Sequence, residues 1–397
     1  MIKNQLLKGP GLPVICGLIL CCILVAGLWP FHQPENQVSW SQSSDGLSFG
    51  HYGMVMSSST LQTARSQAEE PCTIELWLQS RLIHNNNTII TFYTHENPRQ
   101  FSLSKWKTGF VLRREVRNER HEVSLHETFV ADAFRDGKSV FISITSDGHK
   151  SMVYLDGAAV TPNRDFVFSA KDLTGQIVIG SSPVSSDGWY GQLRGLAVYR
   201  RNITPAQALR DYEVWTKGKR PEIAEDESSV VVYRFDEHQG NIVHNLVSRG
   251  PDLYIPQHFM LLDQPMLQSP WTGFRWTWGY WLDVAINIAG FVPLGFFVYA
   301  YLSERYRTAA AMTSVLVGTA VSLTIELLQA YLPTRNSGMN DLITNTFGTY
   351  IGVVLYRAVG KWLPRVRSGS LKEHLGYEED CTAPMPSASS VPHPDYD

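Results

Sequence analysis

Polar and charged side chains recur at helical spacing in the C-terminal part of the chain, inside stretches that are otherwise rich in Ala, Val, Leu and Gly. Side chains at i and i+4 share one face of a helix, and this spacing relates Asp283 to Asn287 and Asp341 to Asn345. Carboxylates can act as general acids or bases, and an arginine can hold an anion such as phosphate. The candidate catalytic residues are therefore Glu326, Asp341 and Arg335. The candidate binding residues are Asp283, Asn287, Glu326, Gln329, Arg335, Asp341 and Asn345.

Structural roles compete with this chemistry. Asp341 is a natural helix N-cap, where a carboxylate meets the free N–H groups of a helix start. Asn and Gln side chains can link helices by hydrogen bonds. Glu326 needs a partner, and an ion pair with Arg335 would hold the loop between them. No histidine occurs between residues 279 and 363, so neither a Ser/His nucleophile nor a metal site is indicated.

Four apolar segments are the candidates for the helices that position these side chains. They cover residues 11–29, 284–302, 309–332 and 342–356. A helix needs about 20 apolar residues to span a membrane. A cleaved signal peptide is the alternative for the first segment, but the apolar core is longer than the usual h-region and no small-residue cleavage site follows.

Basic residues near the ends of these segments predict the topology, because cytoplasmic loops are rich in Lys and Arg. They are Lys3, Lys8, Arg305, Arg307, Arg357, Lys361, Arg365 and Arg367. Both termini, including residues 1–10, are then cytoplasmic, and residues 31–278 are extracytoplasmic.

The polar set is gathered at the outer ends of the helices, which predicts a pocket that opens outward. The octets at 283–290 and 341–348 share D-[VL]-x-x-N-x-x-G, which suggests an internal repeat.

Short strands dominate residues 40–218. CTIELWLQ (72–79) alternates apolar and polar residues, the period of a strand with one buried face. Many such runs, separated by Asp-Gly turns, predict an antiparallel sandwich. The chain is therefore expected to be multidomain, with an extracytoplasmic antiparallel β-sandwich and a transmembrane bundle of four α-helices.

The sandwich segment resembles the LamG-type concanavalin A-like lectin/glucanase domain, a jelly-roll fold. The resemblance is carried by CTIELWLQS, by the hairpin ISITSDGHKSMVYLDGAAV, and by IVIGSSPVSSDGWYGQLRGLAVYRRNITPAQALRDY, in which a short helix begins near Thr204. Glucanases of this fold need closely spaced carboxylates on one strand, whereas Glu75 stands alone. A non-catalytic, carbohydrate-binding sandwich is expected. Asp156 and Asp187 could help to hold calcium, but both precede glycine and are interpreted as turn residues.

The segment from 279 to 363 resembles the VanZ family of bacterial membrane proteins. The resemblance rests on D-x-x-x-N-x-x-G-F-x-P-L-G from Asp283, S-L-x-I-E-L-x-Q-x-x-x-P-x-R from Ser322, and D-L-x-x-N-x-x-G from Asp341. It implies a small helical bundle in a bacterial inner membrane, and a periplasmic location for the sandwich. The family is associated with glycopeptide antibiotic resistance. The large sandwich before the second helix departs from the family pattern, so this role does not transfer directly.

The remaining segments indicate no further catalytic unit. Residues 219–278 form a connector, and four tryptophans follow at its end and the entry to the second helix, in WTGFRWTWGYW (271–281), as at a membrane interface. Residues 364–397 are polar and rich in Pro and Ser, which predicts a disordered cytoplasmic tail. The five cysteines include no CxxC pair, and the net charge of −3 gives no reason to expect nucleic acid. No cofactor is indicated.

Three functions fit these observations. The first is a binding protein for an envelope polysaccharide, glycolipid or envelope protein, acting in envelope biogenesis or antibiotic tolerance. The second is a membrane enzyme that acts on a lipid-linked phosphate or sugar through Glu326 or Asp341, with Arg335 holding an anion. The third is a transporter, which the apolar cytoplasmic halves of the helices disfavour. We expect binding rather than catalysis.

Overall fold

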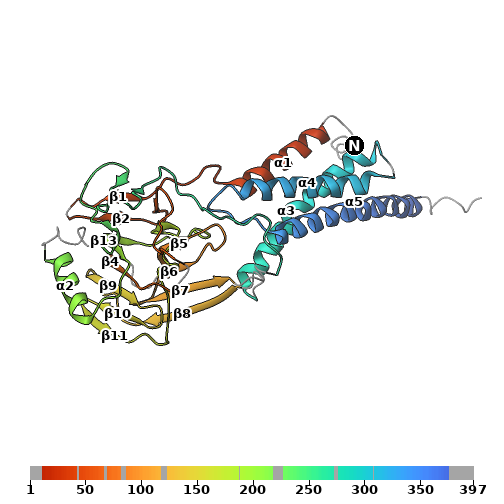
Figure 1. The fold of residues 1–397 in the computed structure, drawn as a ribbon. Coiled ribbons are helices and arrows are strands. Elements are labelled where there is room, and N and C mark those ends of the chain that lie inside the picture. The colour runs from red at the N-terminus through yellow and green to blue at the C-terminus, as the bar shows by residue number, and fades with distance from the viewer. Residues whose placement is uncertain are drawn as a thin grey trace, which may run out of the picture. The chain divides into compact units, whose positions relative to one another are not determined.

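The computed structural model describes residues 11–42, 44–66, 69–81, 86–117, 123–186, 188–217, 227–271, 276–306 and 308–374. The chain forms two compact units. The helical unit consists of residues 1–24, 274–323 and 340–397, and the sandwich unit consists of residues 25–273 and 324–339. Figure 1 shows strands in the one and long helices in the other.

Two antiparallel sheets build the sandwich. The first has the order β1 (Val38–Trp40), β2 (Leu47–Phe49), β13 (Gly191–Tyr199), β4 (Cys72–Ser80), β9 (Ser139–Ser146), β10 (Ser151–Leu155), β11 (Ala158–Val160), and β14 (Ser229–Tyr233) also pairs with β13. The second has the order β15 (Ile242–Val243), β16 (Leu253–Tyr254), β3 (Val55–Ser57), β12 (Gln176–Ile179), β5 (Asn87–Tyr93), β6 (Phe101–Trp106), β7 (Gly109–Arg117), β8 (Val123–Val130). The predicted antiparallel sandwich is confirmed.

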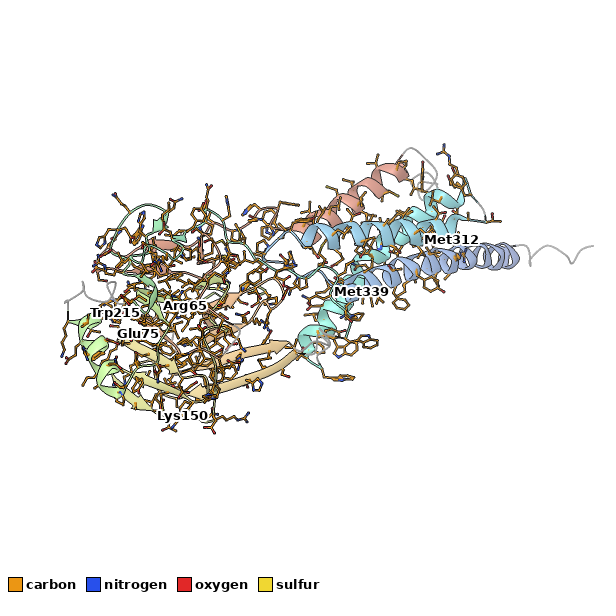
Figure 2. The ribbon with its side chains drawn as sticks, in the orientation of Figure 1. Arg65, Glu75, Lys150, Trp215, Met312 and Met339 are labelled. Carbon is orange, nitrogen blue, oxygen red and sulfur yellow. The ribbon has the colours of Figure 1, made fainter. Side chains whose placement is uncertain are left out.

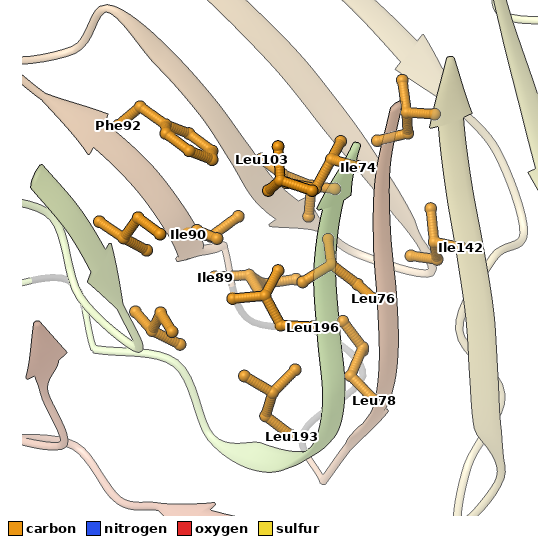
Figure 3. Close-up of a cluster of buried hydrophobic side chains, with 14 of the residues drawn as sticks. Ile74, Leu76, Leu78, Ile89, Ile90, Phe92, Leu103, Ile142, Leu193 and Leu196 are labelled. Atoms are coloured by element: carbon orange, nitrogen blue, oxygen red, sulfur yellow. The ribbon is translucent and has the colours of Figure 1, made fainter. Parts of the chain in front are cut away.

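Apolar side chains from both sheets fill the space between them. Ile74, Leu76 and Leu78 of β4 meet Ile90 of β5 and Leu103 of β6 in this core (Figure 3). The β4 side chains labelled in Figure 3 stand at alternate positions of that strand, which is why the alternation in CTIELWLQ predicted the strand correctly. Burial of this apolar surface is the main favourable term that holds the two sheets together.

Strand β4 differs from the prediction of a single buried face. Its polar residues Thr73 and Glu75 are also buried. The cause is helix α2 (Pro205–Thr216), which covers the outer face of the sheet and packs Trp215 against Phe141 and Tyr199. Thr204 caps this helix as expected, and its side chain accepts a hydrogen bond from the backbone N–H of Gln207.

The Asp-Gly pairs form tight turns, as predicted. Asp156 and Gly157 both have positive φ, at 50° and 79°, and Asp156 Oδ1 accepts from the Phe141 N–H at 2.9 Å. Gly148 also has positive φ, at 90°. Asp187, the other residue considered for calcium, lies outside the described residues.

The connector is shorter than expected, because the sandwich extends beyond residue 218. Strand β14 pairs with β13, and β16 pairs with β3. Residues 255–268 then run along the sandwich, where the buried Phe259 packs with Met54 and Val178. The sandwich also begins slightly earlier than residue 40, at Val38 of β1.

The helical unit is built from α1 (Gly11–Leu28), α3 (Trp278–Ser303), α4 (Ala310–Gln329) and α5 (Met339–His374), of which α1 and α4 end in the sandwich unit. Among the described residues, α1, α3 and α4 are long and apolar enough to cross a membrane. The fourth predicted span, 342–356, lies in α5, whose Asn, Thr, Tyr and Arg residues make it more polar, so this span stays a prediction. Helix α5 continues to His374, so residues 364–374 of the predicted disordered tail are helical.

Candidate functional site

Candidate residues on α3 and α5 meet in the helical unit. The Asn287 side chain forms a hydrogen bond with the Asp341 carboxylate, and the Asp283 carboxylate lies close enough to repel that of Asp341. The two octets that share a sequence pattern therefore face each other. Asp341 lies at the beginning of α5, and Asp283 and Asn287 lie in the first half of α3. Two carboxylates and one amide are therefore close together.

Asn345 links α5 to α4. Its Nδ2 donates to Ser322 Oγ at 3.0 Å, and both side chains are buried. Its Oδ1 is also buried and has no hydrogen-bond partner among the described residues. A buried amide oxygen without a donor is costly, so this atom is a candidate acceptor for a ligand hydroxyl.

Glycines allow α3 and α5 to pack closely. A Cβ at Gly348 would overlap the backbone carbonyl of Ile288, and a Cβ at Gly352 would overlap that of Val292. Gly290 occupies the position in the first octet that matches Gly348, yet nothing lies within 4 Å of its Cβ position. The two octets therefore share a sequence pattern but not their packing.

Glu326, Gln329 and Arg335 lie in the sandwich unit. Glu326 Oε2 accepts from the Gly338 N–H at 2.7 Å. Arg335 donates through Nε, at 3.0 Å, and through Nη2 to the carbonyl oxygen of Trp29. The two charged side chains thus bond to backbone groups of different segments, which differs from the ion pair considered above.

Residues 330–339 are held by two other segments of the sandwich unit. Gln329 Nε2 donates to the Gly27 carbonyl at 2.7 Å. From the connector, Gln264 Nε2 lies 3.0 Å from the Leu332 carbonyl and 2.6 Å from that of Arg335. Gln268 and Gly338 form an isolated parallel bridge. Gln329 and Arg335 therefore stabilise a loop that is already clamped by the connector.

A groove of about 700 Å³ lies on the sandwich, and the sequence did not predict it. We call this the groove; it is lined by Leu112, Thr128, 149–153, 160–162 and 164–167. Its floor includes the buried side chains of Val153 and Phe166, and the exposed residues Lys150 and Asp165 belong to its lining. Lys150 is labelled at the edge of the sandwich in Figure 2.

Hydrogen bonds fix both walls of the groove. Thr128 Oγ1 donates to the Arg164 carbonyl at 2.8 Å, which holds the loop on one side. Asp147 Oδ1 accepts from the backbone N–H groups of His149 and Lys150, at 2.8 and 2.7 Å, which holds the turn on the other side. A preformed site lowers the entropy cost of binding.

A second cavity, of about 640 Å³, lies elsewhere on the sandwich. We call this the arginine cavity; it is lined by 59–62, Arg65, Arg200, Glu227, 229–230 and 247–251, and Arg249 is in the last of these segments. Its arginines are far apart in the sequence, and only the fold brings them together. Arg65 is labelled in Figure 2.

Glu75 is a buried carboxyl group beneath α2. Its oxygens accept from Ser143 Oγ at 3.3 Å and from Trp215 Nε1 at 3.2 Å, and Figure 2 labels Glu75 and Trp215 side by side. Burial raises the pKa of Glu75 to about 8, and the negative charge of Asp211 raises it as well, against these hydrogen bonds. Glu75 is enclosed by protein, so it belongs to the packing of α2 on the sheet.

Two protein-family models match this chain, one over most of the sandwich and one over the segment that includes α3, α4 and part of α5. The model of the concanavalin A-like lectin/glucanases superfamily matches residues 55–208, and the VanZ/LLP1 model matches residues 228–360. The chain joins a concanavalin A-like domain to a VanZ-like region. Both resemblances noted in the sequence are confirmed. The VanZ-like match begins at residue 228 rather than 279, so it includes β14 and the connector that clamps the 330–339 loop.

Several solved structures are similar to part of this chain. They include a SAP-like pentraxin from Limulus polyphemus (16% identity, TM-score 0.34, covering 58% of this chain and 95% of that chain). The binding domain of botulinum neurotoxin DC, in complex with rat synaptotagmin II, matches with 15% identity and a TM-score of 0.32, over 45% of each chain. This chain therefore spans less than half of that relative. No curated protein matched the chain.

Among the described residues, no group of three or more His, Cys, Asp or Glu side chains could hold a metal ion. Sequence reasoning singled out the polar residues of the VanZ-like region, because they recur with helical spacing on single segments. It missed the groove, the arginine cavity and Gln264. The residues of the two cavities come from separate strands and loops, and no periodic pattern marks them.

Proposed function

We propose that this protein binds a glycan of the bacterial cell envelope through its concanavalin A-like domain while its apolar helices hold it in the inner membrane. The observation that carries the proposal is the groove, which is preformed, of ligand size and placed on a lectin-like fold in a chain with membrane-length helices. Small-molecule sites commonly have volumes of about 300–1,000 Å³. Residues 31–278 would then face the periplasm.

The chemistry of the groove suits a sugar. Sugar rings present C–H groups on their faces and hydroxyl groups at their edges. Met152, Pro162 and Val167 are partly exposed in the lining and offer apolar surface to the ring face, while Lys150 and Asp165 offer a donor and an acceptor for hydroxyl groups. An apolar surface with a few polar groups is the usual composition of a small-molecule site.

The polar contacts of the VanZ-like region support a second element of the proposal, a site for a polar lipid headgroup such as that of a glycolipid. Asn345 Oδ1 is a buried acceptor without a donor among the described residues, and in the same unit the Asn287 side chain bonds to Asp341, within range of the Asp283 charge. Buried polar groups in membrane segments usually face such functional sites.

A glycan array tests the proposal with the full chain in detergent. We expect binding to at least one envelope saccharide, and we expect the double variant Lys150→Ala/Asp165→Ala to weaken it by about tenfold, the loss of about 1.4 kcal/mol. Lys138→Ala is the matched control, because Lys138 is exposed on the sandwich outside the groove. An array without any bound saccharide, or equal binding by the double variant, would contradict the proposal.

The topology needs its own test. Reporter fusions between residues 303 and 308, in the segment that joins α3 to α4, should report the cytoplasm. A periplasmic signal there would contradict the arrangement in which the sandwich faces the envelope.

A further inference from the structure

The arginine cavity concentrates positive charge that its own lining does not neutralise. Arg65, Arg200 and Arg249 contribute three guanidinium groups, and Glu227 is the acidic residue among the described residues that line it. The lining therefore carries a net charge of +2, in a chain whose net charge is −3. Like charges in one cavity repel each other, and a bound anion would relieve this repulsion.

The nearby Glu70 carboxylate is engaged elsewhere. Its Oε2 accepts from the Arg65 N–H at 3.0 Å, and its Oε1 accepts from Ser66 Oγ at 2.7 Å. The Glu70 carboxylate is thus bonded to the backbone N–H of Arg65 and to the Ser66 hydroxyl, neither of which is a guanidinium group. Glu70 does not belong to the cavity lining. Glu70 orders the backbone around Arg65 and offsets only part of the charge.

Arg200 is held in place at the cavity. Its Nε donates to the Thr63 carbonyl at 2.7 Å, and its Nη2 donates to the Gln62 carbonyl at 3.1 Å. A guanidinium group has five N–H donors, so these bonds leave donors for a ligand. Burial lowers the pKa of Arg200, and the charges of Arg65 and Arg249 lower it further, while Glu70 opposes the shift. The lowering of the Arg200 pKa by Arg65 and Arg249 agrees with three guanidinium groups that lie close enough to repel one another.

The rest of the lining identifies the kind of anion. Ser59, Thr60, Gln62 and Ser248 supply hydroxyl and amide groups. The described residues of the lining include no aromatic side chain on which a nucleotide base could stack. Polar residues predominate over apolar ones, which suits neither an acyl chain nor an apolar peptide. The volume of about 640 Å³ is larger than one phosphate ion requires.

We infer that the arginine cavity binds an acidic saccharide, whose carboxylate or phosphate group lies among Arg65, Arg200 and Arg249 while its hydroxyl groups contact Ser59, Thr60 and Gln62. Arginine binds both kinds of anion through paired N–H donors. The inference goes beyond the proposed function, because it concerns a second site, separate from the groove, and requires an acidic group on the ligand.

Binding of a tetragalacturonide to the full chain in detergent, measured by isothermal titration calorimetry, tests this inference. The comparison ligands are the same oligosaccharide with its carboxyl groups reduced to alcohols, and inorganic phosphate. We expect the acidic form to bind at least tenfold more tightly than the reduced form. Its affinity should fall with added salt, because screening weakens charge interactions at an open site.

Substitutions locate the binding. Arg249→Gln and Arg65→Gln should each weaken binding of the tetragalacturonide about tenfold. Both residues are exposed, so these variants should fold even if Arg200→Gln does not. Arg210→Gln in α2 is the matched control, and the groove variant Lys150→Ala/Asp165→Ala should also retain binding. Loss of tetragalacturonide binding in that groove variant would overturn the assignment to the arginine cavity.

Equal binding of the acidic and reduced forms would overturn the inference and leave the proposed function intact. Binding of phosphate without binding of the tetragalacturonide would overturn the assignment of a saccharide. The two tests can also give opposite answers. If no saccharide on the array binds but the tetragalacturonide binds in a way that depends on the arginines, the groove proposal is rejected and the arginine-cavity inference is supported. The two proposals can therefore fail separately.

Discussion

The side-chain amide of Gln264 donates a hydrogen bond to the backbone carbonyl of Arg335, with 2.6 Å between nitrogen and oxygen. The same Nε2 lies 3.0 Å from the carbonyl of Leu332 and 3.3 Å from that of Gln329. These carbonyls belong to the last residue of α4 and the loop after it, where the Gln329 and Leu332 carbonyls also accept from the backbone N–H groups of Leu332 and Arg335. A residue of the connector thus completes the end of a helix that is remote in sequence.

Replacing Gln264 should loosen this loop. Gln264→Ala removes the donor from the carbonyls, and we expect the local stability to fall by about 1–2 kcal/mol. Hydrogen exchange measured by mass spectrometry on peptides from residues 327–339 should then become faster by about tenfold. Gln257→Ala, an exposed glutamine of the same connector, should leave exchange in these peptides unchanged. Equal exchange in wild type and Gln264→Ala would show that the clamp does not stabilise the loop.

A charge exchange between Glu326 and Arg335 should not restore the protein. Glu326 accepts from the Gly338 N–H, and Arg335 donates to the Trp29 carbonyl, so each reversed charge would face the wrong backbone group. We expect Glu326→Arg and Arg335→Glu each to lower the yield of folded protein in size-exclusion chromatography after detergent extraction. The double variant should be at least as poor. Recovery of wild-type yield in the double variant would instead reveal a direct ion pair.

Glu75 should make stability fall as the pH rises. Its pKa is raised from 4.5 to about 8 by burial, so the folded state retains a proton that the unfolded state loses above pH 4.5. This contribution is fully present below the unfolded pKa and is lost at about 1.4 kcal/mol per pH unit up to about pH 8.

The variant Glu75→Gln keeps an acceptor for Trp215 and removes the titration. We expect its melting temperature in detergent to fall less than that of wild type between pH 5 and pH 8. Glu213→Gln, on the exposed face of α2, should follow the wild-type profile. Parallel profiles for wild type and Glu75→Gln would contradict a raised pKa at this site.

Features that depend on local sequence were predictable. The alternation in CTIELWLQ, the cap at Thr204 and the Asp-Gly turns each follow from the geometry of a few neighbouring residues. The helical spacing of Asp283 and Asn287 likewise placed these two residues on one face of a helix. These patterns carry their own geometry, so one sequence is sufficient to recognise them.

Features that depend on distant segments were not predictable. Glu75 is buried because α2 returns over the outer face of β4, which no pattern within β4 indicates. The Arg335 guanidinium bonds to the carbonyl of Trp29, just after α1, which is remote from Arg335 in the sequence. Backbone carbonyls have the same chemistry at every position, so a sequence does not show which one an arginine selects. The arginine cavity escaped prediction because its three arginines are far apart in the sequence and only the fold brings them together.

The matched glycines of the two octets offer a direct test of helix packing. A Cβ at Gly348 would overlap the Ile288 carbonyl, whereas a Cβ at Gly290 would meet nothing within 4 Å. We expect Gly348→Ala to force α3 and α5 apart and to cost about 1–3 kcal/mol, the usual range for overpacking. Gly290→Ala should be neutral or stabilising, because alanine favours the helix over glycine by about 1 kcal/mol. Melting temperatures in detergent compare the two variants under identical conditions. Similar losses in both would contradict the close approach of Gly348 to Ile288, and would favour two octets that pack alike.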